Sequence, residues 1–130
     1  MEEIGGAFGE IGLFCIIFLV LRPILQAVVN SLRKRGKTLP NWLKKTSQFV
    51  TKNHRYAGIA ALVAIALHFI LQYINYSVVP VAGLIAFLLL AVQTVLGFGL
   101  TRQKDKERRK KMALVHRVLG IAIVVAVIIH

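Results

Sequence analysis

Hydrophobic positions fall into four long runs separated by short polar segments. The runs extend from about Ile4 to Asn30, Asn53 to Ile74, Val78 to Leu100 and Met112 to His130. About 20 apolar residues of helix cross a hydrocarbon layer about 30 Å thick. Backbone groups in lipid need hydrogen-bond partners within their own segment, which favours helices. The pattern therefore predicts an all-α integral-membrane protein, a four-helix up-down bundle that forms a single domain over residues 1–130.

Basic residues are confined to the ends of these runs. The chain has 17 Lys and Arg against 5 Asp and Glu, a net charge of +12, yet no Lys or Arg precedes Arg22 or lies between Arg55 and Arg102. Most occur in segments 33–52 and 102–111, which an up-down bundle places on one side. Excess Lys and Arg in short loops is typical of the cytoplasmic side. We therefore expect cytoplasmic basic loops, both termini outside, and the inner membrane of a bacterium.

The same charge could indicate a nucleic-acid partner, but the sequence does not support one. No aromatic and basic surface of a known nucleic-acid-binding module accompanies the charge. We expect contact with membrane lipid and no contact with nucleic acid. Within the longest polar segment, residues 31–52, the part from Trp42 to Val50 is predicted to lie as a basic helix on the membrane surface.

An internal repeat relates the second run to the fourth. Residues 54–60 (HRYAGIA) match residues 116–122 (HRVLGIA) at five of seven positions. A basic segment precedes each copy, and an apolar run ending in histidine follows it. Such a repeat predicts two similar helix pairs arranged in parallel. The second and fourth helices should therefore run in the same direction.

The four histidines of the chain lie on these two helices at matching positions. The separation in sequence between His54 and His68 is the same as that between His116 and His130, fourteen positions in each case. Fourteen helical residues advance about 21 Å and turn about 1400°, close to four full revolutions, so both histidines of a helix share one face. Two parallel helices would thus present one histidine pair at each of two depths.

Three kinds of chemistry can use such pairs. A single membrane histidine often only hydrogen-bonds a neighbouring helix, but four in matched register are harder to explain in this way. Zinc usually takes four protein ligands, or three and an open position, whereas each depth offers two histidines. Haem iron needs only two axial protein ligands, which two facing helices of a bundle can supply. The sequence therefore predicts two haem b groups between the second and fourth helices.

Glycines accompany the histidines at regular intervals. Gly58 and Gly120 each follow a histidine by one helical turn along the same face, and Gly83 and Gly97 in the third run have the same separation as the histidines. A flat macrocycle between helices needs neighbours without side-chain bulk, so all four are candidate cofactor-binding residues. Close helix packing through small residues explains the same positions, and both interpretations stay open.

Three arginines are candidate partners of the inner haem. Arg22 lies inside the first run, where a charged side chain is costly, and Arg55 and Arg117 each follow an inner histidine. We predict that one or more of them pairs with haem propionates. For Arg55 and Arg117 the alternative is extension of the side chain to the membrane interface.

Together these residues resemble a known family. The doubled histidine spacing and the glycines, over about residues 53–130, are similar to those of bis-haem b-type cytochromes, especially the haem-bearing half of cytochrome b of quinol:cytochrome c oxidoreductases. Similar paired histidines occur in NADPH oxidases and ferric reductases. The resemblance implies that His54 with His116 binds an inner haem and His68 with His130 an outer one. Helices with a quinol-oxidation motif and a flavin or NADPH domain have no counterpart in the sequence.

The expected function is electron transfer across the membrane by a dihaem cytochrome, as a subunit or module of a quinone-linked oxidoreductase. The expected partner is quinol or quinone, or a redox partner subunit. A polar group near the outer histidines could bind a quinone head, although it also suits an interfacial aromatic belt; it comprises Gln72, Tyr73, Asn75 and Tyr76. Two other function classes remain open, a histidine-lined proton or metal transporter and a haem-free assembly subunit that binds anionic lipid.

Overall fold

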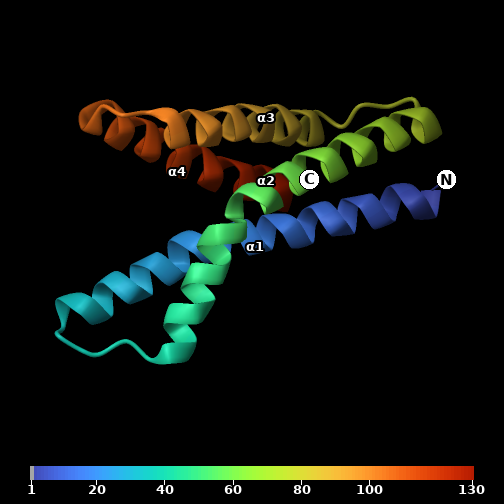
Figure 1. Ribbon diagram of the computed structural model, residues 1–130. Coiled ribbons are helices and arrows are strands. Elements are labelled where there is room, and N and C mark those ends of the chain that lie inside the picture. Colours follow the sequence, from blue (N-terminus) through green and yellow to red (C-terminus); the bar gives the residue numbers. More distant parts are fainter. Residues whose placement is uncertain (1) are drawn as a thin grey trace.

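Four helices make up the fold. The computed structural model describes residues 2–130 and contains α1 (Glu2–Lys34), α2 (Asn41–Tyr76), α3 (Val81–Arg102) and α4 (Lys106–Ile129) (Figure 1). Each helix includes a stretch long and apolar enough to cross a membrane. This confirms the prediction of an all-helical chain with four membrane-length helices, which indicates an integral membrane protein.

The helices run alternately in opposite directions, and both termini point toward the same end of the bundle (Figure 1). Helix α1 packs along α2, α3 packs along α4, and α2 also contacts α3. The chain therefore forms two helix pairs joined through α2 and α3. Consecutive helices are antiparallel neighbours because the connections between them are short, comprising only residues 35–40, 77–80 and 103–105.

Helices α2 and α4 begin well before the predicted apolar runs, at residues 41 and 106 in place of about 53 and 112, and α1 ends four residues after its predicted run. Segment 42–50 is helical, as the sequence predicts, and it forms the first part of α2. Leu43 and Val50 are buried there, as is Val29 near the end of α1, and Phe18 meets Phe49 edge-on with ring centres 6.2 Å apart. These contacts extend the α1–α2 pair past the rest of the bundle, and α2 changes direction along its length (Figure 1).

Special backbone positions mark the tight connections. Gly36 after α1 has φ 69°, and Ser77 after α2 has φ 52°, so both adopt the left-handed conformation that ends a helix. The Ser77 N–H donates to the Tyr73 carbonyl oxygen at 2.8 Å. At the start of α4 the Asp105 carboxylate accepts a hydrogen bond from the Glu107 N–H at 3.1 Å, which satisfies one free donor of the first turn.

One apolar layer at mid-depth holds the four helices together. Ala61 lies midway in sequence between His54 and His68, so the layer falls between the two histidine depths. Each helix contributes one buried side chain to this layer: Ile16, Ala61, Leu90 and Ile123.

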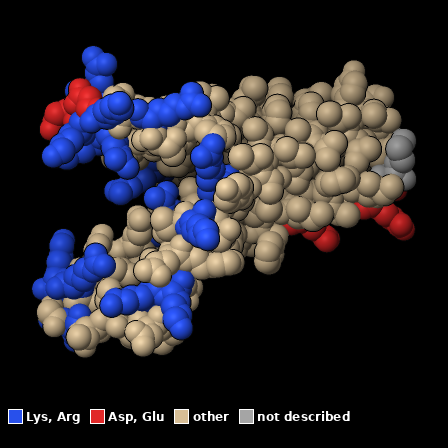
Figure 2. All heavy atoms as spheres, in the orientation of Figure 1, with Lys and Arg blue, Asp and Glu red and all other residues tan. Residues whose placement is uncertain are grey.

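The outside of the bundle suits lipid. Large apolar side chains such as Phe14, Val95 and Ile128 are more than 70% exposed, which a water-soluble monomer rarely tolerates over a whole surface. Lys and Arg gather at one end, on two projecting parts with a notch between them, while the long middle of the bundle carries none on the face shown (Figure 2). We call this end, formed by the 35–40 and 103–105 connections and the adjoining helix ends, the basic end.

Candidate cofactor sites

The histidine nearest the basic end on α2 faces its counterpart on α4. The ring centres of His54 and His116 are 6.3 Å apart, and the ring planes are inclined by 67°. Both side chains are partly buried. The Nδ1 atoms of both rings are buried and have no hydrogen-bond partner in residues 2–130. A buried ring nitrogen without a partner is costly, so this pair retains unused binding capacity.

The second pair repeats this arrangement at the other depth. The ring centres of His68 and His130 are 6.4 Å apart, and their planes are inclined by 86°. His130 follows the last residue of α4 and is held by its N–H, which donates to the Ala126 carbonyl oxygen at 3.0 Å. Because fourteen helical positions separate the two histidines of each helix, the pairs lie about 21 Å apart along the bundle.

Both separations suit two imidazoles that share one metal ion. A nitrogen-to-metal bond is about 2.0–2.1 Å long, and allowing about 1.1 Å from each nitrogen to its ring centre, two rings on opposite sides of an ion have centres about 6.3 Å apart. The observed 6.3 and 6.4 Å agree with this value. Within residues 2–130 no group of three or more His, Cys, Asp or Glu side chains could hold a metal ion. Each pair therefore offers two candidate ligands and lacks the ligand set of a bare zinc site.

The backbone of α1 orients one of the outer histidines. The Nδ1 atom of His68 lies 2.7 Å from the Gly5 carbonyl oxygen, so in this contact Nδ1 carries the proton and donates it. The lone pair of Nε2 is then available as a ligand. Carbonyl oxygens commonly orient metal-binding histidines in this way.

Glycines of α1 and α3 make room for the outer rings. A Cβ atom at Gly9 would lie 2.9 Å from Nδ1 of His68, and one at Gly83 would lie 3.0 Å from Cε1 of His130. Gly9 on α1 therefore corresponds to Gly83 on α3, as His68 on α2 corresponds to His130 on α4. A close glycine–histidine approach thus occurs in both helix pairs, with the two glycines 74 positions apart and the two histidines 62 positions apart. Gly9 is a residue of the outer site that sequence reasoning missed.

The other candidate glycines have different surroundings. A Cβ atom at Gly97 would be in ordinary contact with Cε1 of His116, at 3.4 Å. Gly58 faces the Leu19 side chain, 4.0 Å from the position of a Cβ atom, and Gly120 faces Gln93 at 3.3 Å. Gly83 and Gly97 thus lie directly against histidines, whereas Gly58 and Gly120 make close helix contacts.

Gln93 is a further residue of the inner site that sequence reasoning missed. Its Nε2 donates to the His116 carbonyl oxygen at 2.7 Å, while its Oε1 is buried without a partner in residues 2–130. In the register that relates Gly9 to Gly83, Gln93 corresponds to Leu19. The polar amide of Gln93 inside an apolar run was the sequence feature that could have identified this residue. Because Leu19 occupies the corresponding position in α1, the two helix pairs differ beside the inner histidines.

Positive charge surrounds the inner pair. Arg22 is partly buried, its Nε is buried without a partner in residues 2–130, and its charge acts on both inner histidines and on Arg117. The ion pairs among residues 2–130 are both exposed and both near the start of α4, joining Arg108 to Asp105 and Lys110 to Glu107. Arg22 and Arg117 belong to neither pair, so this site favours an anionic group.

Arg55 has a different environment. Its guanidinium lies over the ring of Phe98 on α3, 4.7 Å from the ring centre. This cation–π contact holds Arg55 on the α2–α3 side of the bundle. Of the three candidate arginines, Arg22 is the one whose charge acts on both inner histidines.

The polar group near the outer histidines forms no single cluster. Tyr76 donates a hydrogen bond to the Glu2 carboxylate, and Gln72 lies beside Gly5, 3.8 Å from the position of a Cβ atom there. The Nδ2 atom of Asn75 is buried without a partner in residues 2–130, and Tyr73 is exposed. These side chains mainly join the ends of α1 and α2.

Comparison with known proteins does not assign the chain to a family. No family model matches it, and neither does a curated protein or a solved structure. Function must therefore be argued from the two histidine pairs and their surroundings.

Proposed function

We propose that the protein is an integral-membrane b-type cytochrome that binds two haem groups and transfers electrons across the membrane. The observation that carries the proposal is the pairing of all four histidines, two at each of two depths. Ring centres 6.3 and 6.4 Å apart match the separation expected for two imidazoles on opposite sides of one metal ion. Haem iron already has four equatorial nitrogens, so two histidines complete its coordination.

In this proposal His54 and His116 hold the inner haem, and His68 and His130 hold the outer one. Each haem, when bound, supplies one-electron redox chemistry at its iron. The Gly5 carbonyl fixes the proton on Nδ1 of His68 and thereby frees Nε2 for coordination. Arg22 and Arg117 provide positive charge beside the inner pair, suited to haem carboxylates.

The apolar layer between the two depths favours electron transfer over ion transport. Its buried members, one from each helix, carry no polar atoms on their side chains. No polar or charged residue within residues 2–130 is fully buried. These four side chains therefore offer a proton or metal ion no ligand, although the Cys15 thiol packs against them, whereas an electron needs no polar path.

The charge pattern indicates the membrane setting, and the proposed electron transfer indicates the class of partner. Cytoplasmic placement of the basic end gives both termini an external location, in a bacterial inner membrane. The electron donor or acceptor is then a membrane quinol or quinone, or a redox subunit. In that setting the protein acts as part of a larger oxidoreductase.

An absorption spectrum of the protein purified in detergent tests the proposal. We expect a b-type Soret band that shifts on reduction with dithionite, and we expect the shift to be lost when all four histidines are replaced by alanine. A wild-type protein that shows no such band when produced with haem in excess would overturn the proposal and leave the transporter and assembly-subunit alternatives.

A further inference from the structure

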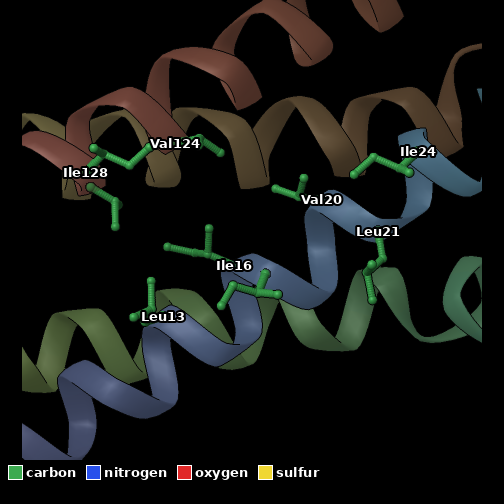
Figure 3. Close-up of a pocket in the computed structure, with 9 residues that line it drawn as sticks. Leu13, Ile16, Val20, Leu21, Ile24, Val124 and Ile128 are labelled. Atoms are coloured by element: carbon green, nitrogen blue, oxygen red, sulfur yellow. The ribbon is translucent and has the colours of Figure 1, made fainter.

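A groove with aliphatic walls runs between α1 and α4 (Figure 3). Its volume is about 300 Å³, and it is bounded by α1 from Leu13 to Ile24 and by α4 from Val124 to Ile128. Polar atoms contribute almost nothing to its walls. The groove exists because α1 packs along α2 and α4 along α3. It includes none of the four histidines.

The length and depth of the groove suit one lipid acyl chain. The stretch of α1 from Leu13 to Ile24 spans about 16 Å of helix. Half of a hydrocarbon core about 30 Å thick is about 15 Å, the depth of one leaflet. On α1 the groove extends from Leu13, past the layer residue Ile16, toward the basic end, and its α4 wall continues from the layer residue Ile123 away from the basic end. The groove therefore begins in the half of the membrane nearer the basic end and crosses the apolar layer at mid-depth.

Positive charge follows at the basic end of the same groove. Arg117 precedes Val124 by two helical turns, so it lies on the groove face of α4. It is exposed and belongs to neither ion pair of residues 2–130. On the other wall, α1 ends with Arg33 and Lys34. Lys and Arg side chains border the notch between the two projecting parts (Figure 2). Apolar walls that end in cations match an amphiphile with an anionic head.

We propose that this groove binds an anionic glycerophospholipid, with one acyl chain between α1 and α4 and the phosphate beside Arg117. Charge argues against a second copy as the occupant. Two parallel copies in one membrane, each with a net charge of +12, would bring two basic ends together. An anionic lipid neutralises the same cations. The apolar walls of the groove include none of the four histidines, whereas Arg117 is shared with the positive charge proposed beside the inner haem.

Native mass spectrometry of the detergent-purified protein tests the site with two probes, phosphatidylglycerol and phosphatidylcholine. We expect one phosphatidylglycerol to be retained per chain and to be preferred over phosphatidylcholine. Arg117→Gln should reduce this preference about fivefold, the effect of one cation near a membrane surface. Arg109→Gln removes the same charge from the basic end outside the groove and should change the preference less.

A second pair of variants tests the apolar walls. Ile17 lines the groove and is 54% exposed, whereas Ile11 is 50% exposed on the same helix but does not line it. Ile17→Trp should therefore displace the retained lipid, and Ile11→Trp should leave it bound. Circular dichroism and gel filtration of both variants check that the helices and the monodisperse state are intact.

Several outcomes would overturn the lipid site. They are equal retention of the two lipids by the wild type, equal effects of Arg109→Gln and Arg117→Gln, and lipid retention by a folded Ile17→Trp variant. A dimer that Ile17→Trp dissociates would assign the groove to a second copy instead. The absorption spectrum is a separate measurement, so a protein without haem that retains the lipid would defeat only the cytochrome proposal.

Discussion

The Nδ1 atom of His68 lies 2.7 Å from the carbonyl oxygen of Gly5, and this contact ties the outer histidine of α2 to the first turns of α1. Among residues 2–130 the ring of His130, the other outer histidine, has no equivalent hydrogen bond. In the register that relates Gly9 to Gly83, Gly5 corresponds to Val79, which precedes α3 and lies outside any helix. The two ligands proposed for the outer haem are therefore held differently, His68 by a backbone carbonyl and His130 by its position at the end of α4.

Gly9→Ala should disrupt the outer pair. The new methyl group would lie 2.9 Å from Nδ1 and 3.0 Å from Cε1 of His68, too close for the ring to keep its position. Moving the ring also weakens its hydrogen bond to Gly5. We expect loss of the outer haem and retention of the inner one, measured by haem content and by separate redox titration of the two centres.

Gly6→Ala is the matched control, because within residues 2–130 a Cβ at that position would have no neighbouring atom within 4 Å apart from the adjoining residues and the backbone of its own helix. Replacing a helical glycine by alanine usually stabilises a helix by about 0.5–1 kcal/mol. Gly6→Ala should therefore raise or preserve the thermal stability in detergent, and Gly9→Ala should lower it. Equal haem contents and equal stabilities of the two variants would show that His68 does not depend on this close approach.

The two glycines of α3 predict a graded effect on the histidines of α4. A methyl group at position 83 would lie 3.0 Å from His130, but one at position 97 would make only an ordinary contact, 3.4 Å from His116. Gly83→Ala should thus reduce outer-haem occupancy, while Gly97→Ala should leave the inner haem bound. Haem content per chain measures both effects, and the reverse order would contradict the placement of these glycines.

Arg22→Leu should lower the midpoint potential of the inner haem. A nearby cation favours the reduced form, and one unit charge at about 10 Å with an effective dielectric of 20 contributes about 1.7 kcal/mol, or about 70 mV for a one-electron couple. Arg33→Leu, in the last turn of α1, serves as the control and should have a smaller effect. Unchanged potentials and haem occupancy in Arg22→Leu would exclude a pairing role for Arg22.

The inner haem should have the higher potential of the two. Arg22, Arg117 and the basic end surround the inner pair, whereas Glu2, Glu3 and Glu10 lie toward the outer end. Electrons would then pass from the outer to the inner haem in the absence of a membrane potential. Redox titration of His68→Ala, which retains the inner haem, and of His54→Ala, which retains the outer one, gives the order. A higher potential for the outer haem would refute this electrostatic argument.

The histidine arrangement was largely predictable because it depends on regular features. Helical periodicity places His54 and His68 on one face, and the internal repeat requires α2 and α4 to be parallel. Under these two conditions, histidines that the repeat relates lie at the same depth in the membrane. The four helices themselves followed from the lengths of the apolar runs. The starts of α2 and α4 did not. Packing of Leu43 and Val50 extends α2 ahead of its apolar run, and α4 begins after the capping residue Asp105, in a polar segment.

The contacts around the rings could not be predicted in the same way. They depend on which face α1 turns toward α2 and α3 toward α4, and uniformly apolar helices do not determine this face. Gly9, Gly5 and Gln93 became part of the sites only through that packing. Aligning the first apolar run with the third, as the histidine repeat aligns the second with the fourth, would have related Gly9 to Gly83 beforehand.

The number of haem groups per chain tests the central claim most directly. A pyridine haemochrome assay, with protein quantified by amino-acid analysis, should give two b haems for the wild type. The double variant His54→Ala/His116→Ala and the double variant His68→Ala/His130→Ala should each retain one, because the two pairs are independent sites about 21 Å apart. A wild-type content of about one haem per chain that His68→Ala leaves unchanged would exclude the outer site. A wild-type content near zero would show that neither histidine pair binds haem.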